Sequence, residues 1–144
     1  FNVRFGDPEA QVVLPRLETD LLAILTALAS GSLNIDPLRW SKDAMVCVVI
    51  ASGGYPGSYE KGKEISGLDL AEEDSNTTVF HAGTDLKEGK IVTSGGRVLG
   101  VTSAAFSLDA AIMRSYEAVN KIHFDGMYYR RDIAAKGLKK LEGN

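Results

Sequence analysis

Glycine-bearing turns cut the second half of this chain into short apolar segments, and their spacing restricts the folds that it can adopt. Three strand-like runs follow one another, at Thr77–Ala82, Lys90–Ser94 and Arg97–Ser103. Gly89 lies in the turn before the second run, and Gly95-Gly96 suits a tight hairpin between the last two. Strands joined by such short turns pair antiparallel. The pattern therefore predicts a small antiparallel β-meander or partial barrel.

An earlier apolar run and two helical patterns complete this part of the predicted fold. Ala44–Ala51 is rich in valine and isoleucine, which is typical of a buried strand. Ser107 can cap a helix that runs to about Lys121, and a short basic helix ends near Leu141. Helices combined with antiparallel strands predict an α+β fold class.

The beginning of the chain has patterns of its own. Phe1–Phe5 alternates apolar and polar residues, as a half-buried strand does. Between about Pro8 and Ser30, leucines recur at steps of three and four residues, which predicts a helix whose leucine face belongs to the core. Pro15 is expected to divide this segment into a short turn and a longer helix, and Gly31 to end it.

Composition narrows the range of partners. The 144-residue chain has a net charge of −3, which disfavours nucleic-acid binding because that needs a basic surface. No apolar run approaches the roughly 20 residues that span a bilayer, so no membrane partner is expected. The single cysteine, Cys47, is predicted to be a buried, reduced thiol, which favours the cytoplasm. No signal-peptide pattern is visible. Because the chain has no initiator methionine and begins with strand-like residues, it is expected to be a fragment or a processed piece.

The opening strand is the first candidate for chemistry. Its alternation places Asn2 and Arg4 on one face, so that a neutral oxygen ligand and a cation stand side by side. Magnesium at a nucleotide site prefers hard oxygen ligands, and a neighbouring arginine can neutralise charge that develops on a phosphoryl or acyl-phosphate group. The alternative is that both side chains only solvate an exposed strand face. The spacing alone leaves both interpretations open.

Five longer motifs carry a family resemblance. They are Arg4-Phe5-Gly6-Asp7-Pro8-Glu9-Ala10-Gln11, Ala51-Ser52-Gly53-Gly54-Tyr55-Pro56-Gly57, Val79-Phe80-His81-Ala82-Gly83-Thr84, Thr93-Ser94-Gly95-Gly96-Arg97-Val98-Leu99 and Tyr129-Arg130-Arg131-Asp132-Ile133. In this order, and over essentially the whole chain, they resemble the C-terminal part of glycinamide ribonucleotide synthetase. This family is the phosphoribosylamine–glycine ligase of purine synthesis, within the ATP-grasp superfamily.

The resemblance implies a reaction and a set of roles. ATP phosphorylates the carboxylate of glycine, and the amine of 5-phosphoribosylamine then displaces phosphate. Asn2 would hold Mg²⁺ (or Mn²⁺) as the second member of a Glu-x-Asn pair whose glutamate would precede Phe1. Arg4 would stabilise phosphoryl or acyl-phosphate charge, and Asp7 would orient the substrate or Arg4.

The resemblance also implies how the chain is organised. Residues 1–33 would be the C-terminal segment of the ATP-grasp domain, a strand plus helix, and residues 34–144 a hybrid-motif-like C-terminal α+β domain. The lobes that bind ATP and the N-terminal substrate domain would lie outside this chain, so the chain alone is expected to be inactive. Animal members of the family are fused to two further purine-pathway activities, which makes a fusion possible here.

Two further segments are weaker candidates for substrate binding. Gly57–Lys63 fits the first seven positions of a phosphate-binding P-loop, but Glu64 stands where Ser or Thr should hold magnesium, so we predict no P-loop. A substrate-side or packing role is predicted for this loop, including Gly53 and Gly54.

The other weak candidate is Arg130 with Arg131. This pair could bind the ribose phosphate at a helix start, or could simply be a solvated basic helix end. A different class of function also stays open for the whole chain. It would be a non-catalytic module that packs against the ATP-binding lobes or a partner, since the chain lacks the nucleotide-binding elements.

Overall fold

The computed structural model describes residues 3–32 and 36–142 of the chain. Within them, strands occupy Ala44–Ser52 (β1), Thr77–His81 (β2), Thr84–Lys87 (β3), Lys90–Thr93 (β4), Arg97–Ala105 (β5) and Met127–Tyr129 (β6). Helices occupy Ala10–Val13 (α1), Leu14–Arg16 (η1, a 3₁₀ turn), Leu21–Ala29 (α2), Leu68–Ala71 (α3), Leu108–Val119 (α4) and Ala135–Glu142 (α5). The predicted α+β class is confirmed, and none of the described helices is long and apolar enough to cross a membrane.

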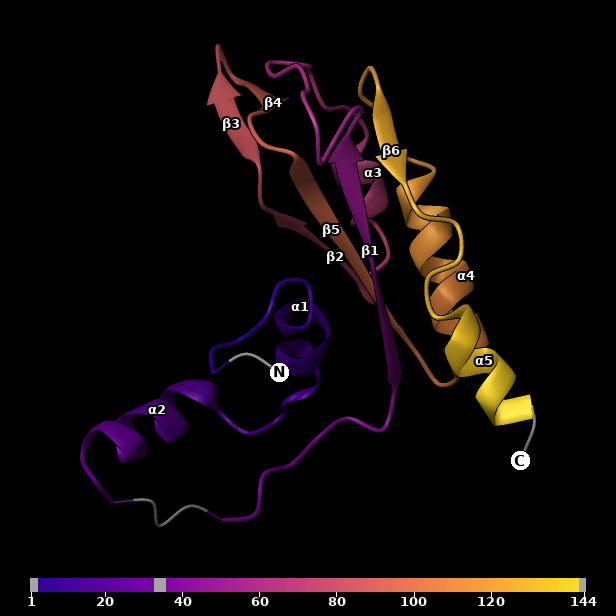
Figure 1. The fold of residues 1–144 in the computed structure, drawn as a ribbon. Helices are drawn as coiled ribbons and strands as arrows, with labels where there is room; N and C mark the ends of the chain where they lie inside the picture. The colour runs from indigo at the N-terminus through magenta and orange to yellow at the C-terminus, as the bar shows by residue number, and fades with distance from the viewer. Residues whose placement is uncertain (1–2, 33–35, 143–144) are drawn as a thin grey trace.

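The strands form two sheets, and their order differs from that of a simple meander. A four-stranded antiparallel sheet has the order β2-β5-β1-β6, and β3 pairs only with β4. β5 thus lies between β1 and β2, which are neighbours in sequence among the strands but do not pair (Figure 1). Ala44 pairs with Ala105 at one end of the central ladder, and Ala51 pairs with Arg97 at the other.

The hairpin predicted at Gly95-Gly96 is wrong. β4 pairs back onto β3 through a turn at Glu88-Gly89, where φ is 51° and 79°. Two consecutive positive φ angles match the twist of a tight hairpin, which explains the glycine there. Gly95-Gly96 instead leads the chain out of the small sheet and into β5.

Helix α4 covers one face of the large sheet and closes the core. It packs against β1 and β5, and the Ser115 hydroxyl, fully buried, donates a hydrogen bond to Val46 O at 2.9 Å. The buried face of this helix is formed by small or branched side chains, namely Ala111, Ser115, Ala118 and Val119. The predicted cap is confirmed, because the Ser107 side chain accepts a hydrogen bond from Ala110 N.

The structure corrects the expected strand at the start of the chain. Residues 3–5 form a bend and an irregular segment rather than a strand, with no described neighbour to pair with. Asn2 lies outside the described residues. Arg4 therefore lies on no strand of the described chain, because an alternating pattern needs a neighbouring strand to pair with.

The leucine-rich segment is helical as predicted, but its leucine face is not in the core. Pro15 lies in the short turn η1, and α2 begins after it, capped by Asp20, which accepts a hydrogen bond from Ala23 N at 3.0 Å. Figure 1 shows α2 projecting away from the sheet, and it contains no buried residue. Leu25 and Leu28 of the predicted face are 49% and 51% exposed, because the periodicity predicts the helix but not what covers it.

Candidate functional site

The opening motif is anchored by a residue far away in sequence. The Asp7 carboxylate lies 3.0 Å from Nη2 of Arg97, and Nη1 of Arg97 donates to the Asp7 carbonyl oxygen at 3.0 Å. The other carboxylate oxygen of Asp7 accepts a hydrogen bond from Nε2 of Gln11 at 3.1 Å. Both carboxylate oxygens of Asp7 are therefore held, one by Arg97 of β5 and the other by Gln11 of the following helix α1.

Arg4 takes no part in this cluster. Its Nη1 donates to the neighbouring Phe5 carbonyl oxygen at 2.8 Å, and its side chain is exposed. The structure therefore pairs Asp7 with Arg97 rather than with Arg4, which was one of the two partners predicted for Asp7. Among the described residues, no carboxylate forms an ion pair with the Arg4 guanidinium.

A floor of glycines lies next to the Asp7–Arg97 pair. Gly83 O accepts hydrogen bonds from Ser94 N at 2.7 Å and Gly95 N at 3.1 Å, so two loops meet backbone to backbone. A Cβ added to Gly83 would lie 2.5 Å from Arg97 O and 2.6 Å from the Gly95 Cα. Because both clashes are with main-chain atoms, only glycine fits at this crossing. We call Gly83, Gly95 and Gly96 the glycine floor.

The loop after β1 is fastened to this floor. Ser52 N donates to Gly96 O at 2.8 Å, and the Ser52 hydroxyl donates to Gly95 O at 2.9 Å. The Tyr55 ring lies so close over Gly96 that a Cβ there would be 2.2 Å from the ring. The motifs that contain Ser52, Gly83 and Gly95 thus meet at one end of the large sheet. Asp7, from the opening motif, joins them there through Arg97.

Gly53 and Gly54, predicted as weak substrate contacts, have structural reasons to be glycine. A Cβ on Gly53 would lie 2.6 Å from Gly126 O. Gly54 has a φ of 95°, and a Cβ there would lie 2.2 Å from Ser58 O. Both glycines are therefore required by close backbone approach, whatever else they contact.

The rest of this loop agrees with the rejection of a P-loop. No helix begins directly after Lys63, and its ammonium group is held 2.7 Å from Glu60 and 3.1 Å from Asp125. The hydrogen bond with Glu60, followed by that with Asp125, raises the pKa of Lys63. Its charge is thus already shared between two carboxylates beside a small hollow of about 120 Å³.

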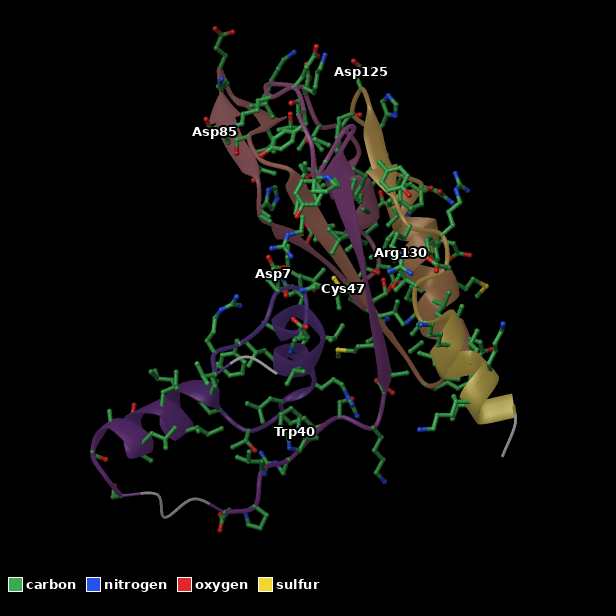
Figure 2. All side chains as sticks on the ribbon, in the orientation of Figure 1. Asp7, Trp40, Cys47, Asp85, Asp125 and Arg130 are labelled. Carbon is green, nitrogen blue, oxygen red and sulfur yellow. The ribbon has the colours of Figure 1, made fainter. Side chains whose placement is uncertain are left out.

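Arg130 and Arg131 are not brought to this site. Figure 2 shows Arg130 on the helical side of β1, with Asp7 on the other side near α1. Nε and Nη2 of Arg130 donate to the two carboxylate oxygens of Asp132 at 2.9 and 2.7 Å, and this pairing lowers the pKa of Asp132. Arg131 lies over the Tyr129 ring at 5.4 Å from its centroid.

The described residues also limit what metal chemistry the chain can supply. They contain no group of three His, Cys, Asp or Glu side chains that could hold a metal ion. Asp7, the carboxylate in the opening motif, is already engaged by Arg97 and Gln11. The free thiol of Cys47 faces Thr102 between strands, and burial raises its pKa, so the protonated form is favoured.

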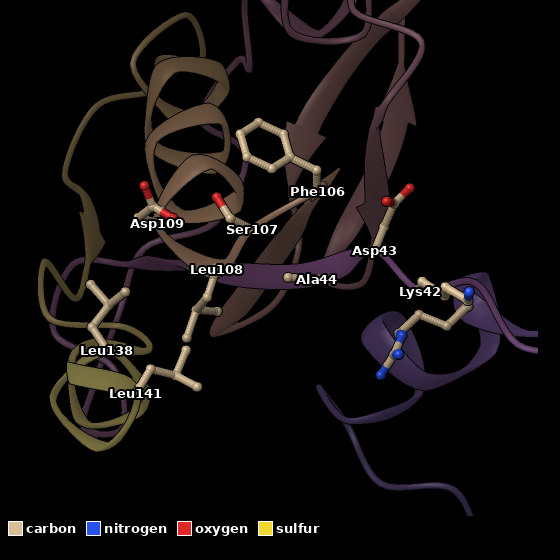
Figure 3. Close-up of a pocket in the computed structure, with 10 residues that line it drawn as sticks. Lys42, Asp43, Ala44, Phe106, Ser107, Leu108, Asp109, Leu138 and Leu141 are labelled. Atoms are coloured by element: carbon tan, nitrogen blue, oxygen red, sulfur yellow. The ribbon is translucent and has the colours of Figure 1, made fainter. Parts of the chain in front are cut away.

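A second hollow, of about 690 Å³, lies at the opposite end of the sheet (Figure 3). It runs between the start of α4, the start of β1 and the end of α5. Its apolar lining comes from Ala44, Phe106, Leu108, Leu138 and Leu141. It contains none of the motif residues and is separate from the glycine floor.

Comparison with known proteins identifies the family. The family model described as phosphoribosylglycinamide synthetase, C domain, matches residues 45–136. The chain belongs to this family. A phosphoribosylamine–glycine ligase of Synechocystis is 56% identical over 139 residues, which cover 96% of this chain and 33% of that protein. The crystal structure of the Thermotoga maritima phosphoribosylamine–glycine ligase has a TM-score of 0.78 and 37% identity, and the match covers 91% of this chain and 32% of that one.

The family membership confirms the resemblance predicted from the motifs, and the Thermotoga similarity supports the α+β fold. A bifunctional purine biosynthetic protein of Schizosaccharomyces pombe is also 48% identical over 138 residues, covering 96% of this chain and 17% of that protein. The chain spans about a third of the length of the ligases that it matches.

Arg97 belongs to the cluster around Asp7, although its local sequence does not mark it as a candidate site residue. It stands within the Thr93–Leu99 motif, which was used only as a mark of resemblance. Its partner, Asp7, lies 90 positions away. A local pattern cannot reveal a contact between residues so far apart. An acidic residue in one family motif and a basic residue in another would have been a signal that the two could pair.

Proposed function

We propose that this chain is the C-terminal part of an ATP-dependent ligase that joins glycine to 5-phosphoribosylamine in purine biosynthesis, through a glycyl phosphate. The observation that carries the proposal is the family match over residues 45–136, which includes the whole glycine floor. Asp7 and Arg97 tie the opening motif to that floor. Glycine, 5-phosphoribosylamine and ATP would be bound mainly by parts of the protein that lie outside this chain.

Within the proposed site the residues have distinct tasks. Arg4 would face the phosphoryl or acyl-phosphate group, a role supported by its exposure and by the absence of a carboxylate partner within residues 3–32 and 36–142. A fixed cation stabilises charge that develops in the transition state. Asp7 would orient the substrate or keep the Arg4 loop in place, which its contacts with Arg97 and Gln11 favour.

The metal belongs to the intact protein rather than to the described part of the chain. ATP would carry Mg²⁺ or Mn²⁺ in the proposed reaction, and Asn2 stays our candidate for one ligand, although it lies outside the described residues. The described side chains do not form a metal site by themselves. The roles proposed for Arg4 and Asp7 therefore involve no step through a metal ion.

Replacing Arg4 by alanine in the intact enzyme is expected to lower turnover by more than about tenfold, because the charge-stabilising cation is removed. The measurement is the rate of glycine-dependent phosphate release from ATP with 5-phosphoribosylamine present. Lys87→Ala, which removes an exposed cation from β3, is the matched control and should leave the rate unchanged. A loss smaller than tenfold for Arg4→Ala would show that the assigned role is wrong.

The rival function is a non-catalytic module that packs against the ATP-binding lobes, and the exposed leucines of α2 favour some such contact. We expect the isolated chain to form no glycinamide ribonucleotide. Calorimetry of the isolated chain with ATP and Mg²⁺ separates the two functions. Clear binding would argue against a purely structural role, and ligation of glycine by the chain alone would contradict the expected inactivity.

Cellular context follows from the same proposal. The single free thiol suits a reducing compartment, and we propose the cytoplasm. The bifunctional relative of Schizosaccharomyces pombe supports a possible fusion to other purine-pathway domains. Nucleic acid and membranes are not among the proposed partners, in keeping with the net charge of −3.

A further inference from the structure

Among the described residues, Arg97 makes the only hydrogen bond and ion pair between the opening motif and the large sheet. Its two terminal nitrogens contact one residue at two places, the Asp7 main-chain carbonyl and the Asp7 carboxylate, each at 3.0 Å. A planar guanidinium that binds two acceptors in this way fixes an orientation as well as a distance. Arg97 therefore constrains both the backbone and the side-chain rotamer of Asp7.

The arginine itself stands on a rigid support. It begins β5, where it pairs with Ala51 of β1. A Cβ added to Gly83 would lie only 2.5 Å from the carbonyl oxygen of Arg97, so the backbone of the glycine floor packs closely against Arg97. A residue mounted on a strand of the central sheet can hold a loop more accurately than another loop residue can.

The pair is better suited to positioning than to stabilising the fold. The Asp7 and Arg97 side chains are 42% and 41% exposed. Ion pairs with this exposure contribute little to global stability, because solvent screens them and their side chains lose freedom. The main effect of the pair is therefore geometric: it fixes the position of Asp7, which follows the segment that carries Arg4.

We propose that Arg97 is a positioning residue of the ligase, which holds Asp7 and thereby places the Arg4–Gly6 segment over the glycine floor. The proposal rests on the proposed function, since it assigns Arg97 to the site of that reaction. Arg97 acts through Asp7 and need not touch the substrate. Misplacement of a catalytic segment by about 1 Å can cost on the order of a hundredfold in rate, which sets the scale of the effect.

The test uses the intact enzyme and the rate of glycine-dependent phosphate release. Arg97→Ala is expected to lower kcat at least tenfold, while KM for ATP changes less than threefold. Arg97→Lys, which offers a single cationic group to Asp7, should recover part of the loss. The double variant Arg97→Ala with Asp7→Asn should be no slower than the slower single variant, because residues that act as a unit are not additive.

The control is Lys90→Ala, which removes another exposed ion pair, that with Glu64 at 2.8 Å, and should leave kcat unchanged. A kcat for Arg97→Ala within twofold of the wild type would overturn the proposal. So would losses from Arg97→Ala and Asp7→Asn that multiply in the double variant.

A second readout does not depend on activity. Hydrogen exchange of the α1 amides should accelerate in Arg97→Ala, because the Gly6–Ala10 turn, with Ala10 N bonded to Gly6 O at 2.9 Å, loses its anchor. Exchange in β5 should stay as in the wild type, which distinguishes local release from general destabilisation. Unchanged α1 exchange would overturn the proposal. Absence of glycine-dependent turnover in the wild type would instead refute the proposed function, and the exchange result would still decide the role of Arg97.

Discussion

Replacing Phe124 by alanine is expected to lower the free energy of unfolding of this chain by about 3–5 kcal/mol. Phe124 follows α4 and is only 1% exposed, and it is among the largest fully buried side chains of the core. It belongs to the same cluster as Val119 and Ile122, so truncation leaves a cavity in this core as well as losing apolar contact. The loss would be measured as a shift of the urea unfolding midpoint.

Phe106 provides a matched control for this prediction. It is the same residue type, but it is 87% exposed at the turn between β5 and α4. Phe106→Ala removes little buried area, so the change should stay within about 0.5 kcal/mol. If the two variants unfolded at the same urea concentration, Phe124 would not have the core role that its burial indicates.

Gly54→Ala is expected to destabilise the chain by about 3 kcal/mol and to reduce the activity of the intact enzyme. A φ of 95° is strained for any residue with a Cβ, at about 1–2 kcal/mol. The added Cβ would also lie 2.2 Å from Ser58 O, a main-chain atom, and such overpacking typically costs about 1–3 kcal/mol more. Moving this loop would lift Tyr55 from Gly96 and so disturb the glycine floor.

Gly62 separates the two causes within the same loop. Its φ is 81°, yet a Cβ there would have no neighbour within 4 Å. Gly62→Ala should therefore show the backbone strain alone, about 1–2 kcal/mol in urea unfolding. A Gly54→Ala variant as stable as Gly62→Ala, but inactive in phosphate release, would contradict the packing explanation and favour a direct substrate contact at Gly54.

Local patterns predicted most elements of this fold well. The apolar run at Ala44–Ala51 became β1, the cap at Ser107 begins α4, and Pro15 divides the leucine-rich segment as expected. Each of these features depends on a few neighbouring residues, such as a hydroxyl that accepts a backbone hydrogen bond or a ring that prevents helix continuation. Nearby sequence contains the information that they need.

Features that depend on distant residues were predicted less well. The alternation in Phe1–Phe5 is that of a strand, but no described strand lies beside it to pair with. Gly95-Gly96 has the composition of a hairpin turn, yet β5 pairs with β1 and β2 instead of β4. The choice of partner among several antiparallel strands depends on the packing of the complete sheet, which no short window contains.

The candidate site shows the same division. Asp7 and Arg4 could be singled out because the resemblance covers their motif, whereas the contact between Asp7 and Arg97 appears only when the chain is folded. For Arg130 and Arg131 a local pattern left two interpretations open, a phosphate site and a solvated basic helix end. In the structure Arg130 pairs with Asp132 and Arg131 lies over the Tyr129 ring, and Arg130 lies away from Asp7.

The pairing of β1 with β5 also decides when this domain can fold. β1 ends at Ser52 and β5 begins at Arg97, so a long loop must close before the central ladder forms, and its entropy is lost before any contact compensates. During translation, β1 leaves the ribosome before its partner has been made. The apolar residues of β1 have no partner strand until β5 has been synthesised, whereas the local β3-β4 hairpin can form earlier. The central ladder can therefore form only after β5 has emerged.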